Sequence, residues 1–132
     1  MNELNKKSAR ELAALIKEKQ ISSLEVVEAH LRRVEEVNPM VNAVTLVLKE
    51  TALEAAKQAD SASDSDRERA FHGVPFTIKE NIDLMGTPTT NGIPLMAEAM
   101  PPRNAPIVDR MLAAGAIPIG RTNMPELGMR LD

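Results

Sequence analysis

The stretch GVPFTIKENIDL, residues 73–84, decides the fold of this chain, and the rest of the sequence is arranged around it. Its apolar half predicts a buried strand over residues 74–79, because a short run with Val, Phe and Ile suits a pleated sheet. The strand ends on Lys79, and three polar side chains follow within five positions. Lys79 therefore marks either the point where the strand leaves the core or a functional site.

A second apolar run, AIPIG at 116–120, predicts another strand. Between the two strands we expect a helix, with Asn104 as its N-cap, Pro106 in its first turn and Gly115 just past its end. Strand, helix-bearing connection and strand predict the parallel crossover of an α/β sheet. Pro118 has no N–H to donate, so its strand is expected to lie at an edge or to be irregular there. The apolar face of the helix is expected to comprise Ile107, Val108, Met111 and Leu112.

The N-terminal part of the chain predicts a helical hairpin over residues 1–39. Two capping boxes, Ser8 to Glu11 and Ser22 to Glu25, each precede apolar residues at helical spacing. Asn38-Pro39 is expected to end the second helix, because the residue before a proline avoids the α region.

The middle of the chain links this hairpin to the strands. Residues 41–48, VNAVTLVL, predict a strand, and the alanine-rich stretch 52–59 predicts a short helix. Residues 61–69 are polar and dense in charge, so we expect a mobile surface loop there. The predicted fold class is α/β: a helical hairpin (1–39) followed, over 40–132, by strands of a mixed sheet with covering helices.

The composition narrows the classes of function. A net charge of −3 disfavours nucleic-acid binding as the main role, since that role usually requires a basic patch. The chain has no cysteine, which excludes disulfides and thiolate metal sites. No apolar stretch has the length of a membrane span or the position of a signal peptide. We expect a soluble, cytoplasmic protein with no cofactor and no metal.

Lys79 and residues 121–123 lie just past the predicted carboxyl ends of strands, where α/β sheets form their sites. A lone lysine at a strand end is more often a snorkelling or edge-protecting cation. A catalytic lysine must instead be uncharged so that it can act as a base, and burial favours the uncharged form. The apolar strand before Lys79 can supply that burial.

The other polar residues near these ends have simpler interpretations. Asn81 and Asp83 suit a turn, and Asn123 suits a helix N-cap. The loop 86–92, GTPTTNG, can offer backbone N–H groups to a ligand, although such loops more often form only turns.

The histidines and methionines also favour structural roles. His30 and His72 lack the spaced partners of a metal site or of a Ser-His-Asp triad, so we interpret both as structural or surface residues. Met85, Met96 and Met100 are expected to fill gaps rather than to line a pocket.

Three motifs, in order, resemble those of the amidase signature family. GVPFTIKENI (73–82) resembles the segment around that family's catalytic lysine: Gly-apolar-Pro, a short apolar run, then Lys-Asp-Asn. GTPTTNG (86–92) resembles a characteristic turn, and AGAIPIGRTNMPEL (114–127) resembles the block AGAI…GKTN…EF. The N-terminal hairpin and the NAV strand also stand in the expected places, so the resemblance covers nearly all of the chain.

The resemblance implies an amide hydrolase with a Ser-cisSer-Lys triad. A serine nucleophile attacks an amide carbonyl, ammonia or an amine leaves, and water then hydrolyses the acyl-enzyme. By resemblance, Lys79 takes the base role and draws the proton of the nucleophile through a second serine, which lies on a cis peptide bond. Backbone N–H groups of a Gly-rich loop stabilise the oxyanion.

The chain departs from the family pattern at several positions. Glu80 stands where Asp is usual, Ile93 where Ser is common, Arg121 for Lys and Leu127 for Phe. These changes are mild and bear on the substrate pocket more than on the chemistry. A larger departure is that both family serines follow the lysine, whereas every serine of this chain precedes Lys79. Lys79 is thus the one triad member present, and we expect the chain alone to be inactive.

Residues 1–132 are accordingly interpreted as the N-terminal portion of a single amidase domain, with the Gly/Ser-rich C-terminal part absent. The parent is expected to act on a small amide such as indoleacetamide. A protein like the amidase component of glutamyl-tRNA amidotransferase is the alternative, and a non-catalytic binding or assembly fragment is the rival from another class. Expected partners are the amide substrate, the missing C-terminal part and a second copy, because the strand faces 74–78 and 117–119 would lack cover.

Overall fold

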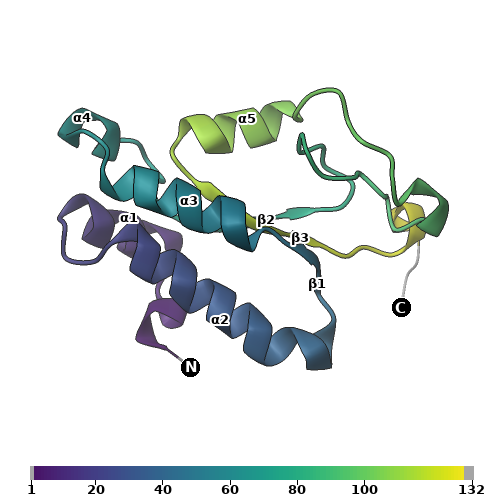
Figure 1. Cartoon of the computed structure of the whole chain (residues 1–132), viewed down its shortest axis with the longest axis horizontal. Helices are drawn as coiled ribbons and strands as arrows, with labels where there is room; N and C mark the ends of the chain where they lie inside the picture. Colours follow the sequence, from purple (N-terminus) through teal and green to yellow (C-terminus); the bar gives the residue numbers. More distant parts are fainter. Residues whose placement is uncertain (1, 130–132) are drawn as a thin grey trace.

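A computed structural model describes residues 2–129 of the chain (Figure 1). Helices lie between successive strands, which confirms the predicted α/β class. The elements are η1 (Glu3–Lys6), α1 (Ala9–Lys17), α2 (Ser23–Val41), β1 (Val44–Val47), α3 (Lys49–Asp60), α4 (Asp64–Arg67), β2 (Pro75–Lys79), η2 (Pro94–Met96), α5 (Pro106–Ala113), β3 (Ile117–Thr122) and η3 (Glu126–Gly128).

The three strands form one mixed sheet in the order β1-β3-β2. β3 lies in the centre, parallel to β2 and antiparallel to β1. The connection from β2 to β3 contains α5, as the strand-helix-strand pattern predicted. Because β2 and β3 are parallel, their carboxyl ends meet at one edge of the sheet, where Lys79 lies opposite Thr122.

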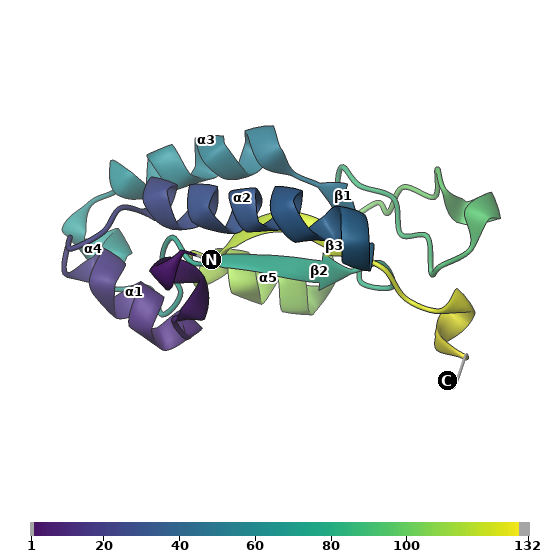
Figure 2. The same ribbon diagram turned by 90° about the horizontal axis from the view of Figure 1, so that it is seen from below.

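Helices cover both faces of the sheet. Figure 2 shows α2 and α3 side by side on one face and α5 on the other. On the first face, Ile117 and Ile119 of β3 pack with buried residues of the two helices, namely Val27, Leu31, Ala52 and Ala56. On the α5 side, Ile78 packs with Val108 and with Leu84 of the following loop.

The apolar strand faces are therefore covered within the chain itself. Val74, Ile78, Ile117 and Ile119 are all buried, so the expectation that these faces lack cover is wrong. The helices α2 and α3 cover Ile117 and Ile119, and α5 covers Ile78. The exposed large apolar side chains lie elsewhere, for example at the end of α2 (Met40 and Val41) and in η2 (Leu95).

The N-terminal hairpin forms as predicted. Both capping boxes are present: Ser8 and Ser22 accept the N–H groups of Glu11 and Glu25, and each glutamate accepts the N–H of its serine. These reciprocal bonds satisfy N–H groups that a helix start otherwise leaves unpaired. The two helices meet over a small core that also reaches the residue before β2, formed by Leu12, Ile16, Val26 and Val74.

The end of α2 differs from the prediction. The helix runs through Pro39 to Val41 and stops at Asn42, whose backbone is left-handed (φ 49°). The Asn38 carbonyl still accepts the Asn42 N–H at 2.7 Å, and its side chain accepts the N–H groups of residues 43 and 44. These bonds offset the donor that Pro39 lacks, and β1 begins later than predicted, at Val44.

The polar stretch 61–69 is not the loop that its composition predicted. It contains the short helix α4, which Ser63 caps by accepting the Asp66 N–H at 3.2 Å. Arg67 donates from its guanidinium to the Asp60 carbonyl, which ties α4 back to the end of α3. The hydrogen bonds of Ser63 and Arg67 stabilise a helical turn in a stretch whose polar composition predicted a loop.

Two predicted N-caps are wrong. Ala105, not Asn104, precedes α5, and the Asn104 side chain instead accepts the Met85 N–H at 2.7 Å. Asn123 precedes no helix, because its side chain donates to the Asn42 carbonyl at 2.6 Å and Pro125 stands before η3. In both places a contact distant in sequence displaced the local cap. Gly115 does follow α5 in a left-handed conformation, as predicted.

The predicted apolar face of α5 holds only in part. Val108 is buried and Met111 and Leu112 are half-buried, but Ile107 is 55% exposed, so its place on that face is wrong. The helix is short and covers only one side of the small sheet (Figure 2). Ile107 and Met111 line an open groove beside β2 instead.

Pro118 lies in the central strand, so the strand is irregular rather than an edge. The pairing of β2 with β3 shifts by one residue between Phe76 and Thr77, which leaves Ile119 without a paired β2 residue. The pairing with β1 stops at Gly120, so β1 does not run alongside Pro118. A one-residue shift changes the face to which later side chains of a strand point. This shift determines where Arg121 lies.

Candidate active site

Lys79 is the last residue of β2, at the edge where the carboxyl ends of β2 and β3 meet. Its backbone carbonyl accepts the Ile82 N–H at 3.0 Å, so the chain turns immediately after it. The side chain is exposed, so within residues 2–129 the apolar strand does not supply the burial expected for an uncharged lysine. In the same residues its amine takes part in no hydrogen bond or ion pair. In this chain Lys79 is therefore placed at the site edge with its amine free.

The Arg121 side chain lies beneath this turn and is 1% exposed. One terminal nitrogen donates to the carbonyls of Ile82 at 2.8 Å and Lys79 at 3.2 Å. The other donates to the Pro88 carbonyl at 3.0 Å and to the Thr87 hydroxyl. Nε donates to the Ile78 carbonyl at 3.4 Å. A single guanidinium thus holds the whole segment from the end of β2 to the following loop.

The charge of Arg121 is buried without a carboxylate in contact. Burial lowers the pKa of the guanidinium from its ordinary value, and the more distant carboxylates of Glu80 and Asp83 act in the opposite direction. Arginine remains protonated because its ordinary pKa lies far above neutrality. The buried cation is therefore compensated by backbone carbonyl dipoles, all from residues 78–88.

The Glu80 side chain links this segment to β1 and to the loop that follows. One carboxylate oxygen accepts the hydroxyl of Thr45 in β1, and the other accepts the hydroxyl of Thr90 in the loop. Its own N–H donates to the Thr122 carbonyl at 3.0 Å. Glu80 thereby joins β1, the end of β3 and the loop around the position of Lys79.

Four backbone N–H groups of the loop 86–92 donate hydrogen bonds within the chain. The N–H groups of Thr87, Thr89 and Asn91 donate to backbone carbonyls, and that of Gly92 donates to the Thr90 hydroxyl at 3.2 Å. These groups are not free for a ligand, which favours the structural interpretation. Gly92 has a positive φ of 72°, and a Cβ there would lie 2.7 Å from the Met124 carbonyl oxygen. The loop 86–92 therefore lies close to the backbone that follows β3.

The remaining predicted residues fall outside this arrangement. Asn81 is exposed, and the backbone carbonyl of Asp83 accepts the Ala105 N–H at 2.9 Å. Met96 and Met100 line a shallow pocket of about 300 Å³ together with Asp83. The expectation that they only fill gaps is therefore wrong for these two, because their loop extends beyond the sheet. Met85 is 57% exposed and absent from that pocket.

Both histidines take structural positions. His72 is 2% exposed, and its Nε2 lies 2.9 Å from the Ala59 carbonyl; His30 is half-buried and lies 2.8 Å from the Val26 carbonyl. Among residues 2–129, no three His, Cys, Asp or Glu side chains come together as metal ligands. In the same part of the chain, no helix is both long and apolar enough to cross a bilayer.

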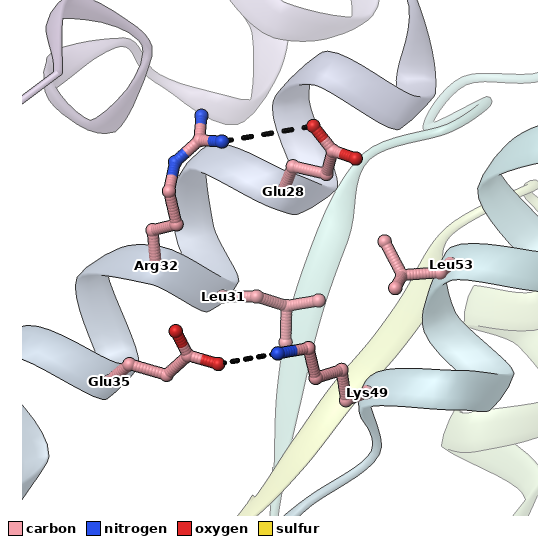
Figure 3. A pocket seen from close by; sticks show the side chains of 6 residues that line it. All are labelled: Glu28, Leu31, Arg32, Glu35, Lys49 and Leu53. Carbon is pink, nitrogen blue, oxygen red and sulfur yellow. Dashed lines mark hydrogen bonds and ion pairs between the residues drawn. The ribbon is translucent and has the colours of Figure 1, made fainter.

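A separate pocket of about 180 Å³ lies between α2 and α3, away from Lys79 (Figure 3). Its charged residues pair with one another, Glu35 with Lys49 at 2.7 Å and Glu28 with Arg32 at 3.8 Å. The hydrogen bond to Glu35 raises the pKa of the Lys49 amine. Leu31 and Leu53 complete the lining. Because its charges are already matched, we interpret this pocket as a groove between packed helices.

The sequence interpretation missed Arg121 and Glu80 as the residues that organise the site. One signal was present: an arginine directly after the buried run AIPIG, in a strand that otherwise has no charge. The interpretation placed Arg121 just past the strand, whereas it lies inside β3. No local pattern identifies the carbonyls that it binds.

The chain belongs to the amidase family, whose model, described as Amidase, matches residues 25–132. Indoleacetamide hydrolase of Bradyrhizobium diazoefficiens is 47% identical over 124 residues, which are 93% of this chain and 24% of that protein. A glutamyl-tRNA(Gln) amidotransferase subunit from Thermoanaerobacter pseudethanolicus is 35% identical over 127 residues, 96% of this chain and 26% of that one. These matches confirm the resemblance to the amidase signature family.

Solved structures agree with the sequence matches. A peptide amidase from Stenotrophomonas maltophilia superposes with a TM-score of 0.82 at 27% identity, over 91% of this chain and 25% of that one. A bacterial aryl acylamidase of the amidase signature family gives a TM-score of 0.82 at 30% identity, over 94% and 26%. The chain thus spans about a quarter of the length of the relatives that it matches.

Proposed function

We propose that this chain carries the catalytic base, Lys79, of an amidase that hydrolyses a small carboxamide to a carboxylate and ammonia or an amine. The observation that carries the proposal is the position of Lys79. It ends a strand at the carboxyl edge of the sheet, with its amine free, inside the motif that resembles the family's lysine segment. In α/β folds, this edge is where side chains meet a substrate.

The proposed mechanism needs two serines from outside residues 80–132, because that part of the chain contains none. The nucleophilic serine attacks the amide carbonyl, and its proton passes through the second serine to the uncharged amine of Lys79. The proton then goes to the leaving nitrogen, which departs as ammonia or an amine. Water attacks the acyl-enzyme by the same proton route and releases the carboxylate.

An arylacetamide such as indoleacetamide is the substrate that we favour. The similarity to a protein named indoleacetamide hydrolase, at 47% identity, exceeds the 35% to the amidotransferase relative. The alternative, glutamine hydrolysis for an amidotransferase, is tested by supplying glutamine to the same preparation and measuring ammonia.

The test is a chimera in which this chain replaces the matched segment of the Bradyrhizobium diazoefficiens hydrolase. That enzyme supplies the remaining three quarters of the length, and indoleacetate formation from indoleacetamide is followed by chromatography. We expect turnover by the chimera and a loss of about 100-fold or more in Lys79→Ala. A folded chimera in which Lys79→Ala keeps its activity would contradict the proposal.

The 132-residue chain alone is expected to show no turnover of either amide, since it carries one of the three proposed catalytic groups. The assay is run on purified chain beside the chimera at equal concentration. Activity that co-elutes with the chain and disappears in Lys79→Ala would contradict this expectation, and would favour a different nucleophile. A binding or assembly role would instead show retention of indoleacetamide without hydrolysis by either preparation.

A further inference from the structure

The acceptors of Arg121 surround Lys79. The guanidinium binds the carbonyl of the residue before Lys79, that of Lys79 itself, and that of Ile82, where the turn closes. Its other terminal nitrogen reaches Thr87 and Pro88, where the loop begins. Every one of these acceptors lies within eleven residues of sequence, while Arg121 comes from a different strand.

Burying the Arg121 cation costs free energy of desolvation, and an apolar side chain at the same place would not carry this cost. Here the cost is offset by four carbonyls and one hydroxyl. Two of these carbonyls, those of Ile78 and Lys79, belong to the end of β2, and the other acceptors belong to the turn and loop that follow it. A guanidinium, with five N–H donors in a fixed plane, can bind such a set simultaneously.

Within residues 2–129, strand pairing holds the backbone of Lys79 only on the side of β3. β3 pairs with β2 up to Lys79 and accepts the Glu80 N–H, but β2 is an edge strand within residues 2–129. The pairing of β2 with β3 ends at Lys79. Beyond it, the path of the chain depends on the hydrogen bonds of the Arg121 and Glu80 side chains. Of the two, only Arg121 binds the carbonyl of Lys79 itself.

We propose that Arg121 is the positioning residue for Lys79: it fixes the peptide groups on both sides of the lysine, so that the amine projects from the sheet edge at a defined place. The inference rests on the proposed function, in which that amine is the base. Arg121 touches no reacting atom in this role. It acts through the backbone of the residues that it binds.

The first experiment measures the positioning directly, in the 132-residue chain, by hydrogen exchange and mass spectrometry. In Arg121→Met, peptides that cover residues 80–92 are expected to exchange at least about 10-fold faster, while peptides of α1 and α2 keep their protection. Arg121→Lys, which keeps a cation with three donors, is expected to restore part of the loop protection. Unchanged exchange over 80–92 in folded Arg121→Met would overturn the proposal.

The second experiment measures the consequence for catalysis in the chimera. Displacing a catalytic group by about 1 Å can cost on the order of 100-fold in rate, so kcat of Arg121→Met is expected to fall by roughly that factor. KM is expected to change by less than about threefold, because Arg121 contacts no substrate. Arg121→Lys is expected to recover most of kcat, and Arg110→Met, on the exposed side of α5, to leave kcat unchanged.

The outcomes separate the two proposals. Near-normal kcat in folded Arg121→Met, together with loss of activity in Lys79→Ala, would overturn the positioning role and leave the proposed function standing. Activity retained by Lys79→Ala would overturn the proposed function, whatever the exchange data show for Arg121. If Arg121→Met unfolds, Thr87→Val replaces it, because it removes one acceptor and keeps the cation; unchanged loop exchange in Thr87→Val would then overturn the inference.

Discussion

The α1–α2 hairpin and the carboxyl edge of the sheet are held together in opposite ways. In the hairpin, the capping hydrogen bonds join residues three positions apart, such as Ser22 and Glu25. At the carboxyl edge, the hydrogen bonds of Arg121 join residues 33 to 43 positions apart. The hairpin packs apolar side chains, whereas the edge gathers carbonyls around one cation. We therefore expect the first region to respond to substitutions that alter apolar packing and the second to substitutions that remove hydrogen bonds.

The largest expected effect is a loss of kcat on substitution of Lys79, at the carboxyl edge, without a change in the helices. Lys79→Arg in the chimera keeps a cation at the sheet edge but cannot act as an uncharged base, so kcat is expected to fall by about 100-fold or more. The helical circular dichroism should not change, because the exposed side chain supports no packing.

Lys57→Arg, on the exposed face of α3, is the matched control and should leave both quantities unchanged. Near-normal kcat in Lys79→Arg would return this lysine to the role of a surface cation. The carboxyl edge would then be a second structural region, and the contrast with the hairpin would be lost.

The next effect is expected in the hairpin core. Ile16 is fully buried against α2 and the residue before β2, so Ile16→Ala leaves a cavity and is expected to cost about 2–5 kcal/mol in the free energy of unfolding. The measurement is urea unfolding of the 132-residue chain followed by circular dichroism. Ile107→Ala, at a side chain that is 55% exposed, is the control and should cost less than about 0.5 kcal/mol. Equal costs at the two positions would contradict the burial of Ile16.

A smaller effect is expected at the start of α2. Ser22→Ala removes the side chain that accepts the Glu25 N–H at 3.1 Å, which should cost about 1 kcal/mol in the free energy of unfolding. Exchange over residues 80–92 is expected to stay as in the unmodified chain at temperatures well below unfolding. Faster exchange in that loop would indicate that the two regions are coupled more tightly than their separate contacts imply.

The smallest effect concerns pH. Hydrogen bonds from the backbone and hydroxyl of Ser22 lower the pKa of Glu25, and those of Ser8 lower the pKa of Glu11. Since the folded pKa lies below the unfolded value of about 4.5, the stabilisation is present above that pH and is lost as the pH falls through the folded value. Glu25→Gln keeps the cap but does not titrate, so its urea midpoint should fall less between about pH 5 and 3.

Glu98→Gln is the control for this measurement, because Glu98 is exposed and lies outside the helices. It is expected to follow the acid dependence of the unmodified chain. If Glu25→Gln did the same, the capping box would not contribute to the acid limb, and the pH response would have to come from other carboxylates.

The sequence was informative for most of the local contacts, although it missed the short helix α4. The capping boxes, the alanine-rich helix α3 and the crossover from β2 to β3 all follow from short-range spacings, and all are present. The position of Lys79 at a strand end also follows from the apolar run before it.

The sequence was misleading where a distant contact competes with a local one. Asn104 and Asn123 each suit an N-cap, but their side chains bind Met85 and Asn42 instead. Pro39 suits a helix end, yet Asn38 compensates by binding residues 43 and 44. The role of Arg121 depends on a one-residue shift in strand pairing, which no period-two pattern contains. The strand end that carries Lys79 could therefore be located from the sequence, but the side chains that bind its backbone could not.

The position of Arg121 in the chain order has a consequence for synthesis on the ribosome. The segment around Lys79 leaves the ribosome about forty residues before Arg121 does, and β1 also waits for residues 120–122 to complete its pairing. Pairing between distant segments is slow and leaves strand edges exposed until it is complete. During that interval the hairpin can fold, but the lysine segment has no cation beneath it. The carboxyl edge of the sheet therefore stays incompletely paired in the nascent chain until the GRTN segment emerges.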